Sequence, residues 1–317
     1  MNVLAVCLNP ALDREFFIDQ FTLNKLNMVP SEKSRMSPGG KGVNVATILS
    51  KYGISLIVTG FLGGYVGYVL ISELRKASPL ISTSFVNIRD ETRENIVITD
   101  TVNHELTEIN SEGPFVSPES VDIFLRKFEV LVQKVQTVVI SGSVPKGIPL
   151  SFYGELTKIA KKYDKTVFWE ARDEIISESM KIALPDVIKY DMRRSEKILG
   201  KILSKEEEYI ATARDFVKNG TKLVILSYKT IHDFIGTADG VWKFSPKVDI
   251  DHSFLLGSGD NFVAAMVLAQ LEGKCCIDMA RYGYAAAVAK TAYIGKEPPS
   301  RGQIREYMNF IISERVD

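Results

Sequence analysis

The sequence predicts an α/β protein in which helices cover both faces of a mostly parallel sheet and a small β-sheet lid is attached. Along most of the 317 residues, apolar runs typical of buried strands alternate with amphipathic stretches typical of helices. Between about residues 83 and 110 this alternation gives way to short stretches that mix β-branched and polar residues. Two glycine-rich segments stand directly before predicted helices, where parallel sheets usually bind their ligands.

The first core elements lie before the interruption. Val3–Leu8 is an apolar run that predicts a buried strand, and a second strand is expected over Leu56–Thr59. Lys41–Tyr52 has its apolar residues at helical spacing and is followed by Gly53, so it predicts a helix. Val66–Ala77 is expected to form the next helix of the core.

The interruption predicts an antiparallel sheet with one face in water, because β-branched and polar residues are mixed there. Its strands are expected over Thr83–Ile88, Glu94–Thr99 and His104–Ile109, completed by Glu15–Phe21 and Asn27–Arg35. The lid would thus consist of two segments, about residues 13–36 and 83–110. Its edge strands offer a route to a homodimer, since such strands can pair across two subunits.

After Pro118 the alternation of strands and helices resumes. The expected strands are Thr137–Ser141, Thr166–Glu170, Asp186–Lys189, Lys222–Ser227, Asp233–Thr237 and Val241–Phe244. The expected helices are Val121–Lys134, Phe152–Lys162, Arg193–Leu199, Glu206–Lys218, Gly259–Leu271, Ile277–Tyr293 and Arg301–Ser313. Because no linker or repeat interrupts the pattern, a single domain over residues 1–317 is expected.

Composition argues against several kinds of partner. The 39 lysines and arginines balance 39 acids, so the net charge of zero argues against broad binding of nucleic acid or anionic membranes. No stretch approaches the ~18 apolar residues of a membrane span. The three cysteines, Cys7, Cys275 and Cys276, have no metal-site or disulfide spacing. With no basic leader before the first apolar run, a cytoplasmic protein with free thiols is expected.

The first glycine-rich segment runs from Ser37 to Asn44 with the sequence SPGGKGVN. Glycines let the backbone approach a ligand closely and leave amide N–H groups pointing at it. Lys41 stands at the helix start, where a cation is unfavourable unless a bound anion compensates for the helix dipole. The alternative is a glycine turn with a solvated lysine. The segment is not a Walker A loop, because Gly42 rather than Ser or Thr follows the lysine.

The second segment, LGSGDNF, runs from Leu256 to Phe262 before a long apolar helix. The amides of Gly257, Ser258 and Gly259 would gather at the helix N-terminus as an anion hole. Asp260 lies in the first turn, where the helix dipole stabilises a carboxylate. A base beside an anion hole suits phosphoryl transfer, in which the base deprotonates the acceptor hydroxyl. The alternative is an acid that only caps the helix.

The two segments together, in this order and about 220 residues apart, resemble the ribokinase/PfkB family of carbohydrate kinases. LNPALD at Leu8–Asp13 is similar to the opening of its 1-phosphofructokinase and tagatose-6-phosphate kinase branch. Further matches run along nearly the whole chain: Pro38–Ala46, Gly60–Gly64, Glu91–Arg93, Ser141–Ser143, Ile188–Lys189 and Gly257–Asp260. The resemblance implies a ribokinase-like three-layer α/β/α core with a β lid, and an ATP-dependent kinase that uses Mg²⁺.

The resemblance also implies a role for each matching residue. Asp260 would be the catalytic base, with Gly257, Ser258 and Gly259 as the anion hole. Lys41 and Arg93 would meet a phosphate already present on the sugar, a clamp that a neutral sugar does not need. Other substrate contacts are expected from Asn9, Asp13, Gly39, Gly40, Asn44 and Ser141. ATP contacts are expected from Lys189, Ser227, Gly257 and Gly259.

The nucleotide half departs from the pattern of the branch. Where a glutamate near Mg²⁺ is usual, the chain has Arg194, which we expect to contact ATP phosphates instead. Asp191 is the remaining candidate for a magnesium shell. Tyr228–His232 replaces a glycine-rich turn, and Glu170–Arg172 replaces Asp-Thr-Ser. Arg172 and Arg194 are therefore expected to replace lost phosphate contacts.

The leading functional hypothesis is phosphorylation of D-fructose 1-phosphate by ATP to fructose 1,6-bisphosphate. Tagatose 6-phosphate is an alternative acceptor that no motif separates from it. A second class is a low-activity sensor of nucleotides and sugar phosphates, suggested by the altered nucleotide segments. A dehydrogenase is disfavoured, because no G-x-G-x-x-G follows the first strand.

Overall fold

The computed structural model describes residues 1–192, 197–228, 232–247, 255–292 and 295–317. Its core sheet contains β1 Val3–Cys7, β4 Leu56–Gly63, β5 Ile81–Thr83, β6 Val86–Ile88, β9 Thr137–Ser141, β10 Thr166–Ala171, β11 Val187–Tyr190, β14 Leu223–Tyr228, β15 His232–Thr237, β16 Gly240–Pro246 and β17 Ile311–Arg315. The strand order is β17-β16-β15-β14-β11-β10-β9-β1-β4-β5, with β6 also paired to β4. The strands from β14 to β5 are parallel, whereas β15, β16 and β17 are antiparallel additions.

Helices cover both faces of this sheet, which confirms the predicted three-layer core. One face carries α1 Lys41–Lys51, α2 Gly64–Ala77, α7 Ser258–Leu271, α8 Cys276–Lys290 and α9 Arg301–Tyr307. The other carries α3 Pro118–Val132, α4 Phe152–Lys162, α5 Asp173–Met180 and α6 Glu206–Lys218. The parallel strands are continuous apolar runs because both of their faces are covered. Within the described ranges, no helix is both long and apolar enough to cross a membrane.

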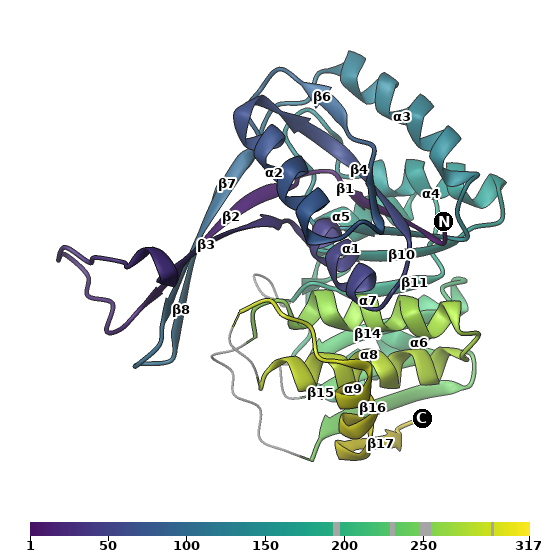
Figure 1. Ribbon diagram of the computed structural model, residues 1–317. Coiled ribbons are helices and arrows are strands. Elements are labelled where there is room, and N and C mark those ends of the chain that lie inside the picture. The colour runs from purple at the N-terminus through teal and green to yellow at the C-terminus, as the bar shows by residue number, and fades with distance from the viewer. Residues whose placement is uncertain (193–196, 229–231, 248–254, 293–294) are drawn as a thin grey trace.

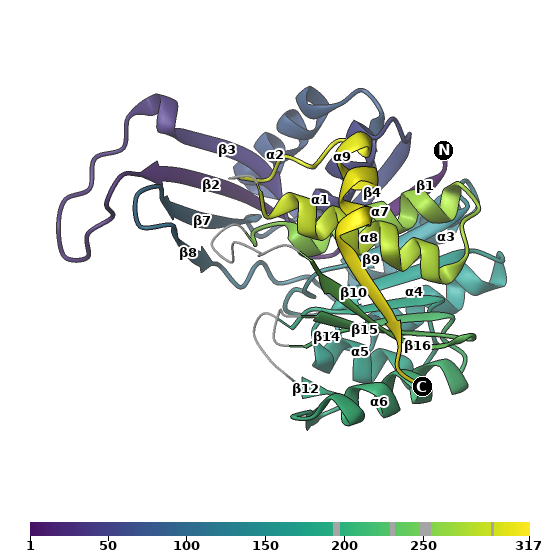
Figure 2. The ribbon, with the colours of Figure 1, turned by 90° about the horizontal axis from the view of Figure 1, so that it is seen from below.

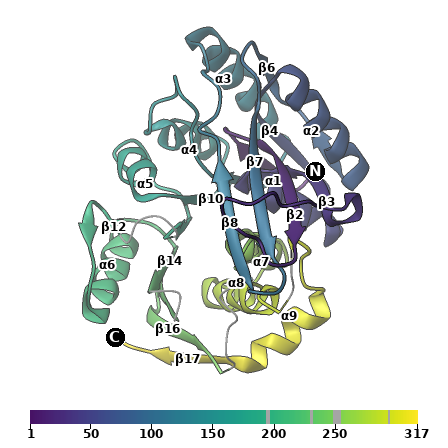
Figure 3. The same cartoon turned by 90° about the vertical axis from the view of Figure 1, so that its left-hand side faces the viewer.

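The lid is a separate sheet with the strand order β3-β2-β7-β8. Its strands are β2 Ala11–Ile18, β3 Ser34–Gly39, β7 Arg93–Asp100 and β8 Glu105–Asn110. Figures 1 and 2 show these strands extending away from the core, and Figure 3 views them from the outer side. The expectation of a wholly antiparallel sheet is wrong at one step, since β2 and β7 are parallel.

Three predicted elements are corrected by long-range pairing. The stretch 83–88 does not belong to the lid: β5 and β6 pair with β4, and their buried isoleucines and valine face the core. The predicted helix over Arg301–Ser313 ends at Tyr307, because the following β17 extends the core sheet beside β16. Of the predicted helix Arg193–Leu199, residues 197–198 instead form β12, paired with β13 (Lys201–Ile202), while 193–196 lie outside the described residues.

Candidate active site

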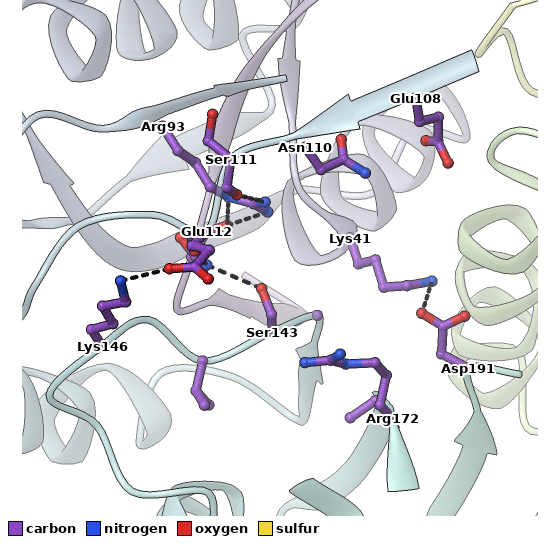
Figure 4. A pocket seen from close by; sticks show the side chains of 14 residues that line it. Lys41, Arg93, Glu108, Asn110, Ser111, Glu112, Ser143, Lys146, Arg172 and Asp191 are labelled. Carbon is purple, nitrogen blue, oxygen red and sulfur yellow. Dashed lines mark hydrogen bonds and ion pairs between the residues drawn. The ribbon is translucent and has the colours of Figure 1, made fainter. Parts of the chain in front are cut away.

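The candidate site lies where neighbouring parallel strands end. Arg172 and Asp191 directly follow β10 and β11, while Asn9 and Ser143 stand two residues after β1 and β9. Because carboxyl ends of parallel strands meet at one edge of a sheet, these side chains surround a common space. They line a cavity of about 620 Å³, called the outer cavity below. Figure 4 shows the side chains of Ser143, Arg172 and Asp191 around it.

A hydrogen bond between Asp260 and Asn44 connects the two glycine-rich segments. Asp260 is only 5% exposed, and its Oδ2 accepts a 2.8 Å hydrogen bond from Asn44 Nδ2 on α1. Gly257 directly precedes α7 and has the left-handed conformation at φ 79°, which glycine adopts without strain. The amide of Ser258 donates to Leu255 O at 3.0 Å. Of the three amides expected to form an anion hole, that of Ser258 is thus engaged within the chain.

Lys41 lies among carboxylates at the centre of the site. Its Nζ is 2.9 Å from Glu170 Oε1, 3.6 Å from Asp191 Oδ2 and 3.7 Å from Asp260 Oδ1. A cation at a helix N-terminus is unfavourable by itself, but three carboxylates outweigh the helix dipole here. The chain supplies these counter-charges itself, and the expectation that Lys41 meets a bound anion stays a prediction.

Glu170, the second-last residue of β10, is fully buried beside Lys41. Burial raises its pKa, but the ammonium groups of Lys41 and Lys189 outweigh burial and hold the pKa below its ordinary value. Ser141 Oγ donates a 2.9 Å hydrogen bond to Glu170 Oε2 and is itself fully buried. The expected direct contact of Ser141 with substrate is therefore corrected to support of Glu170. A Cβ at Gly259 would lie 2.9 Å from Glu170 Oε1, which favours glycine there.

Asp13 lies at the base of the lid, against the backbone of Gly39. A Cβ at that glycine would be 2.2 Å from Asp13 Oδ2, so a larger residue would displace the carboxylate. Asn95 Nδ2 donates a 2.8 Å hydrogen bond to Asp13 Oδ1, and Lys296 forms an ion pair with Oδ2. Lys296 Nζ also lies 3.0 Å from Glu15 Oε1. The C-terminal part of the chain thereby orients a residue of the lid.

Gly40 directly precedes α1 and has a φ of 92°, a conformation that favours glycine. A Cβ there would lie 2.9 Å from Cys7 Sγ, at the end of β1. The close approach brings the start of α1 against the end of the first strand.

Asn9 and Arg93 connect the lid to the core. Asn9 Nδ2 donates to Glu112 O at 2.8 Å and to Ser143 Oγ at 3.1 Å. Arg93 donates twice to Asn9 O, at 2.9 and 3.1 Å, and once to Ser111 O at 3.0 Å. Its guanidinium thus donates to backbone carbonyls and lines the outer cavity, and the expectation that it meets a phosphate stays a prediction.

The model of the pfkB family of carbohydrate kinases matches residues 15–301 of this chain. The chain belongs to this family. A solved structure from Thermotoga maritima, described as a possible 1-phosphofructokinase, is 40% identical over 100% of both chains, with a TM-score of 0.96. The chain also resembles phosphofructokinase-2 from Escherichia coli (23% identity, 98% of both chains, TM-score 0.85). Ribokinase from Thermotoga maritima shares 19% identity over 98% of this chain and 99% of that one, with a TM-score of 0.71.

The protein is therefore a carbohydrate kinase with a ribokinase-like fold, which transfers a phosphoryl group to a sugar hydroxyl. Kinases of this family use ATP and a divalent metal ion. The two most distant of these structures support the fold alone. They leave the acceptor of this kinase to be inferred from its own residues.

A second space in this kinase, the inner cavity, measures about 200 Å³ and adjoins the start of α7. Its lining includes Lys189, Ser227, Asp233, Phe262 and Tyr284. Lys189 Nζ lies 5.6 Å from the centre of the Phe262 ring. Burial raises the pKa of Asp233, although Lys189 and a hydrogen bond from Ser227 oppose that change. The mixture of apolar and charged walls suits a nucleotide base and its phosphates.

The acids around Lys41 do not form a complete metal site. In the parts of the chain that the structure describes, no group of three His, Cys, Asp or Glu side chains is placed to hold a metal ion. A magnesium ion bound to nucleotide phosphates needs only one or two protein carboxylates. Asp191 and Glu170 both approach Lys41 Nζ and fit that smaller requirement. Arg194, the expected ATP contact, lies outside the described residues.

The structure brings together most of the predicted residues but adds others. Lys296, Asn95 and Asp233 were not predicted to contribute. Asp233 had a usable signal, because it stands beside the apolar Phe234 and Ile235 in a predicted buried strand, where acids are unusual. Lys296 had none, since a lysine in a loop is ordinarily solvated.

Proposed function

We propose that this kinase transfers the γ-phosphoryl group of ATP to D-fructose 1-phosphate, giving D-fructose 1,6-bisphosphate and ADP, with Asp260 as general base. The observation that carries the proposal is the placement of Asp260 at the start of a buried helix, hydrogen-bonded to Asn44 and 3.7 Å from Lys41. The choice of acceptor is supported by the 40% identity to the protein described as a possible 1-phosphofructokinase.

In the proposed reaction the free hydroxyl of the sugar attacks the γ-phosphorus, and the bond to the β–γ bridging oxygen breaks. Asp260 accepts the hydroxyl proton while Asn44 keeps its carboxylate oriented. The amides at the start of α7 and the ammonium of Lys41 stabilise the negative charge of the transferring group. ADP then leaves from the inner cavity.

We further propose that the divalent metal is Mg²⁺ and that Asp191 and Glu170 hold it beside the nucleotide phosphates. When bound, the ion would neutralise charge on those phosphates. The protein's own contribution is to place two carboxylates, from the ends of adjacent strands, within 3.6 Å of one lysine ammonium. A divalent cation is favoured beside these two carboxylates because its charge would be balanced by both acids and by the nucleotide phosphates.

The experiment that tests the function is an ADP-release assay on a panel of acceptors. The panel contains D-fructose 1-phosphate, D-fructose 6-phosphate, D-tagatose 6-phosphate and D-fructose, with ATPase activity without acceptor as the background. We expect the highest kcat/KM for D-fructose 1-phosphate. If every sugar gave only the background rate, the kinase proposal would fail in favour of a sensor. A maximum with D-tagatose 6-phosphate would retain the chemistry and change the acceptor.

We extend the proposal to a homodimer formed through the lid and to a cytoplasmic location. The lid segment between β2 and β3 exposes Leu23, Leu26 and Met28, whose exposed fractions are 77%, 86% and 78%. Apolar side chains this exposed are typical of an interface. A related structure is the tetrameric inhibited form of phosphofructokinase-2 from Escherichia coli. The dimer is tested by sedimentation, in which the Leu26→Ser variant should shift from dimer to monomer.

The cytoplasmic location is supported by the three free cysteines, which are typical of a reducing compartment.

A further inference from the structure

Four polar side chains cross one face of the core sheet beneath the start of α7. They are Glu170, Lys189, Ser227 and Asp233, one from each of β10, β11, β14 and β15. Glu170 pairs in register with Lys189, and Ser227 with Asp233. Each stands two residues from an apolar side chain of the cluster beneath α7 and α8, so the four point to the same face. All four line the inner cavity.

The inner cavity carries more negative than positive charge. Among the described residues that line it, the acids outnumber the lysines by four to two. The acids are Glu170, Asp191, Asp233 and Asp260, and the lysines are Lys41 and Lys189. Burial lowers the pKa of His232, also in the wall, so that its imidazole is neutral at pH 7. Because nucleotide phosphates are negative as well, they bind more tightly when one of these acids is protonated.

Asp233 differs from the other three acids. Those three lie within 3.7 Å of Lys41 Nζ, whose charge keeps them ionised. Asp233 is 8% exposed, and burial raises its pKa, opposed by the charge of Lys189 and a hydrogen bond from Ser227. On the facing helix α8, burial raises the pKa of Tyr284, so its hydroxyl brings no charge. Of the four acids, Asp233 therefore takes up a proton most readily.

We propose that Asp233 is a further nucleotide-binding residue, which takes up a proton from solvent when ATP enters the inner cavity and donates a hydrogen bond to a phosphate oxygen. One covalent bond forms, the O–H bond of the carboxyl group, and the buffer supplies its proton. A phosphate is the expected partner because Lys189, whose charge acts on Asp233, lies 3.6 Å from the Cβ position of Gly259 at the start of α7. A hydrogen bond from a neutral acid to an anionic oxygen is short and strong. This role rests on the proposed function, because it assumes ATP in that cavity.

Nucleotide affinity then depends on pH. Because the complex binds one more proton than the free protein, affinity is highest at low pH. It falls as the pH rises from the pKa of Asp233 in the free protein to its pKa in the complex. Within that range each pH unit lowers the affinity by up to about tenfold. Asp233→Asn removes this contribution, because an amide has the shape of the neutral acid and donates a hydrogen bond without titrating.

Calorimetric titration with Mg²⁺ and ADP tests the role of Asp233 without turnover. Each protein is titrated at pH 7 in PIPES and in Tris, whose heats of ionisation differ, so the difference in measured heat gives the protons taken up per ADP. We expect Asp233→Asn to take up fewer protons than the wild type, by up to about one per ADP. Asp239→Asn, in the exposed turn between β15 and β16, is the matched control and should equal the wild type.

The same titrations between pH 6.5 and 8.5 give a second readout. Over this range the Kd of the wild type for ADP should rise roughly 3- to 30-fold more than that of Asp233→Asn. Equal proton uptake or equal pH dependence in the two proteins overturns the proposal. So does a variant that binds ADP more than about tenfold more weakly at every pH, because Asp233 would then act as a carboxylate. If Asp233→Asn fails to fold, the wild-type series decides: a Kd that rises with pH supports the proposal, and one that does not rise overturns it.

The role of Asp233 and the proposed function are tested separately. If wild-type protein binds ADP but phosphorylates no sugar of the panel, the proposed function fails, and the titrations still decide the role of Asp233. If wild-type protein binds no ADP, the role of Asp233 fails, whereas sugar phosphorylation in the assay would still support the proposed function.

Discussion

The core sheet and the lid sheet are held together by different forces. In the core, the strand β1 is unexposed along its whole length, and apolar clusters cover both faces. In the lid, β8 is exposed at most positions, and polar contacts fasten the sheet to the core. Lys296 binds Asp13 and Glu15 at the base of the lid, and Asp100 closes a turn at its outer end.

The difference explains where each part of the reaction is located. Apolar packing does not change with protonation, so Asp260 stands on an element whose position is independent of ligand charge. Charged contacts depend on each partner, so the lid is the part of the molecule that a single substitution or a change of pH should loosen. The comparison is tested by perturbing each region separately.

The largest effect is expected from Asp260→Asn, which alters chemistry without altering the packing of α7. Because the amide is a far weaker base, kcat should fall roughly 10²- to 10⁴-fold. ATP binding and Tm should be nearly unchanged. Asp278→Asn, an exposed acid in the first turn of α8, is the control. Retention of more than about a tenth of wild-type kcat would show that Asp260 is not the base.

An intermediate effect is expected from Lys296→Met, at the base of the lid. Burial lowers the pKa of Lys296, but the carboxylates of Asp13 and Glu15 outweigh it and raise the pKa above its ordinary value. Removing this lysine leaves two buried acids next to each other, although Lys290 also interacts with Glu15. The free energy of unfolding should fall by on the order of 3 kcal/mol, and KM for the acceptor should rise.

The double variant Lys296→Met/Glu15→Gln decides whether charge is the cause. Since Glu15→Gln removes one of the two acids, chemical denaturation should show the double variant to be more stable than Lys296→Met alone. Additive losses of stability would instead mean that Lys296 acts through packing of its carbon chain.

The smallest effect is expected at the outer end of the lid, where Asp100 accepts hydrogen bonds from the amides of Phe21, Val102 and Asn103 at 2.7–3.0 Å. The bond from the Asn103 amide is the main cause of a lowered pKa. A lowered pKa means that this stabilisation is complete above the ordinary aspartate value near 4 and is lost as pH falls towards the folded-state pKa.

Hydrogen exchange between pH 5 and 3, corrected for intrinsic rates, should therefore show the turn 100–105 losing protection before β1 does. Asp100→Asn should give faster exchange in that turn already at pH 7, with little further dependence on pH. Asp239→Asn, in the exposed turn between β15 and β16 of the core sheet, is the matched control and should leave exchange unchanged. Simultaneous loss of protection in both sheets would refute the proposed difference between them.

Much of the core could be predicted because its cause is local. Apolar runs bounded by turn residues predicted the parallel strands, and the two glycine-rich segments correctly placed Asn44 and Asp260 at helix starts. The position of Asp191 at a strand end followed from the same pattern. The sequence did not predict which sheet a segment would join. Residues 83–88 pair with the core sheet rather than the lid, and residues 311–313 belong to an edge strand rather than a helix. A short strand looks the same whichever sheet accepts it.

The identities of the proposed base, the glycines and the strand ends were thus available from local chemistry along the chain. The contacts that assign roles came only from folding. The backbone carbonyls of Asn9 and Ser111 that Arg93 contacts were not predicted. Lys296 gained its role because a loop 283 residues away in sequence meets Asp13 at the base of the lid. Local patterns specify backbone conformation, whereas the partner of a charged side chain depends on which distant segments pack beside it.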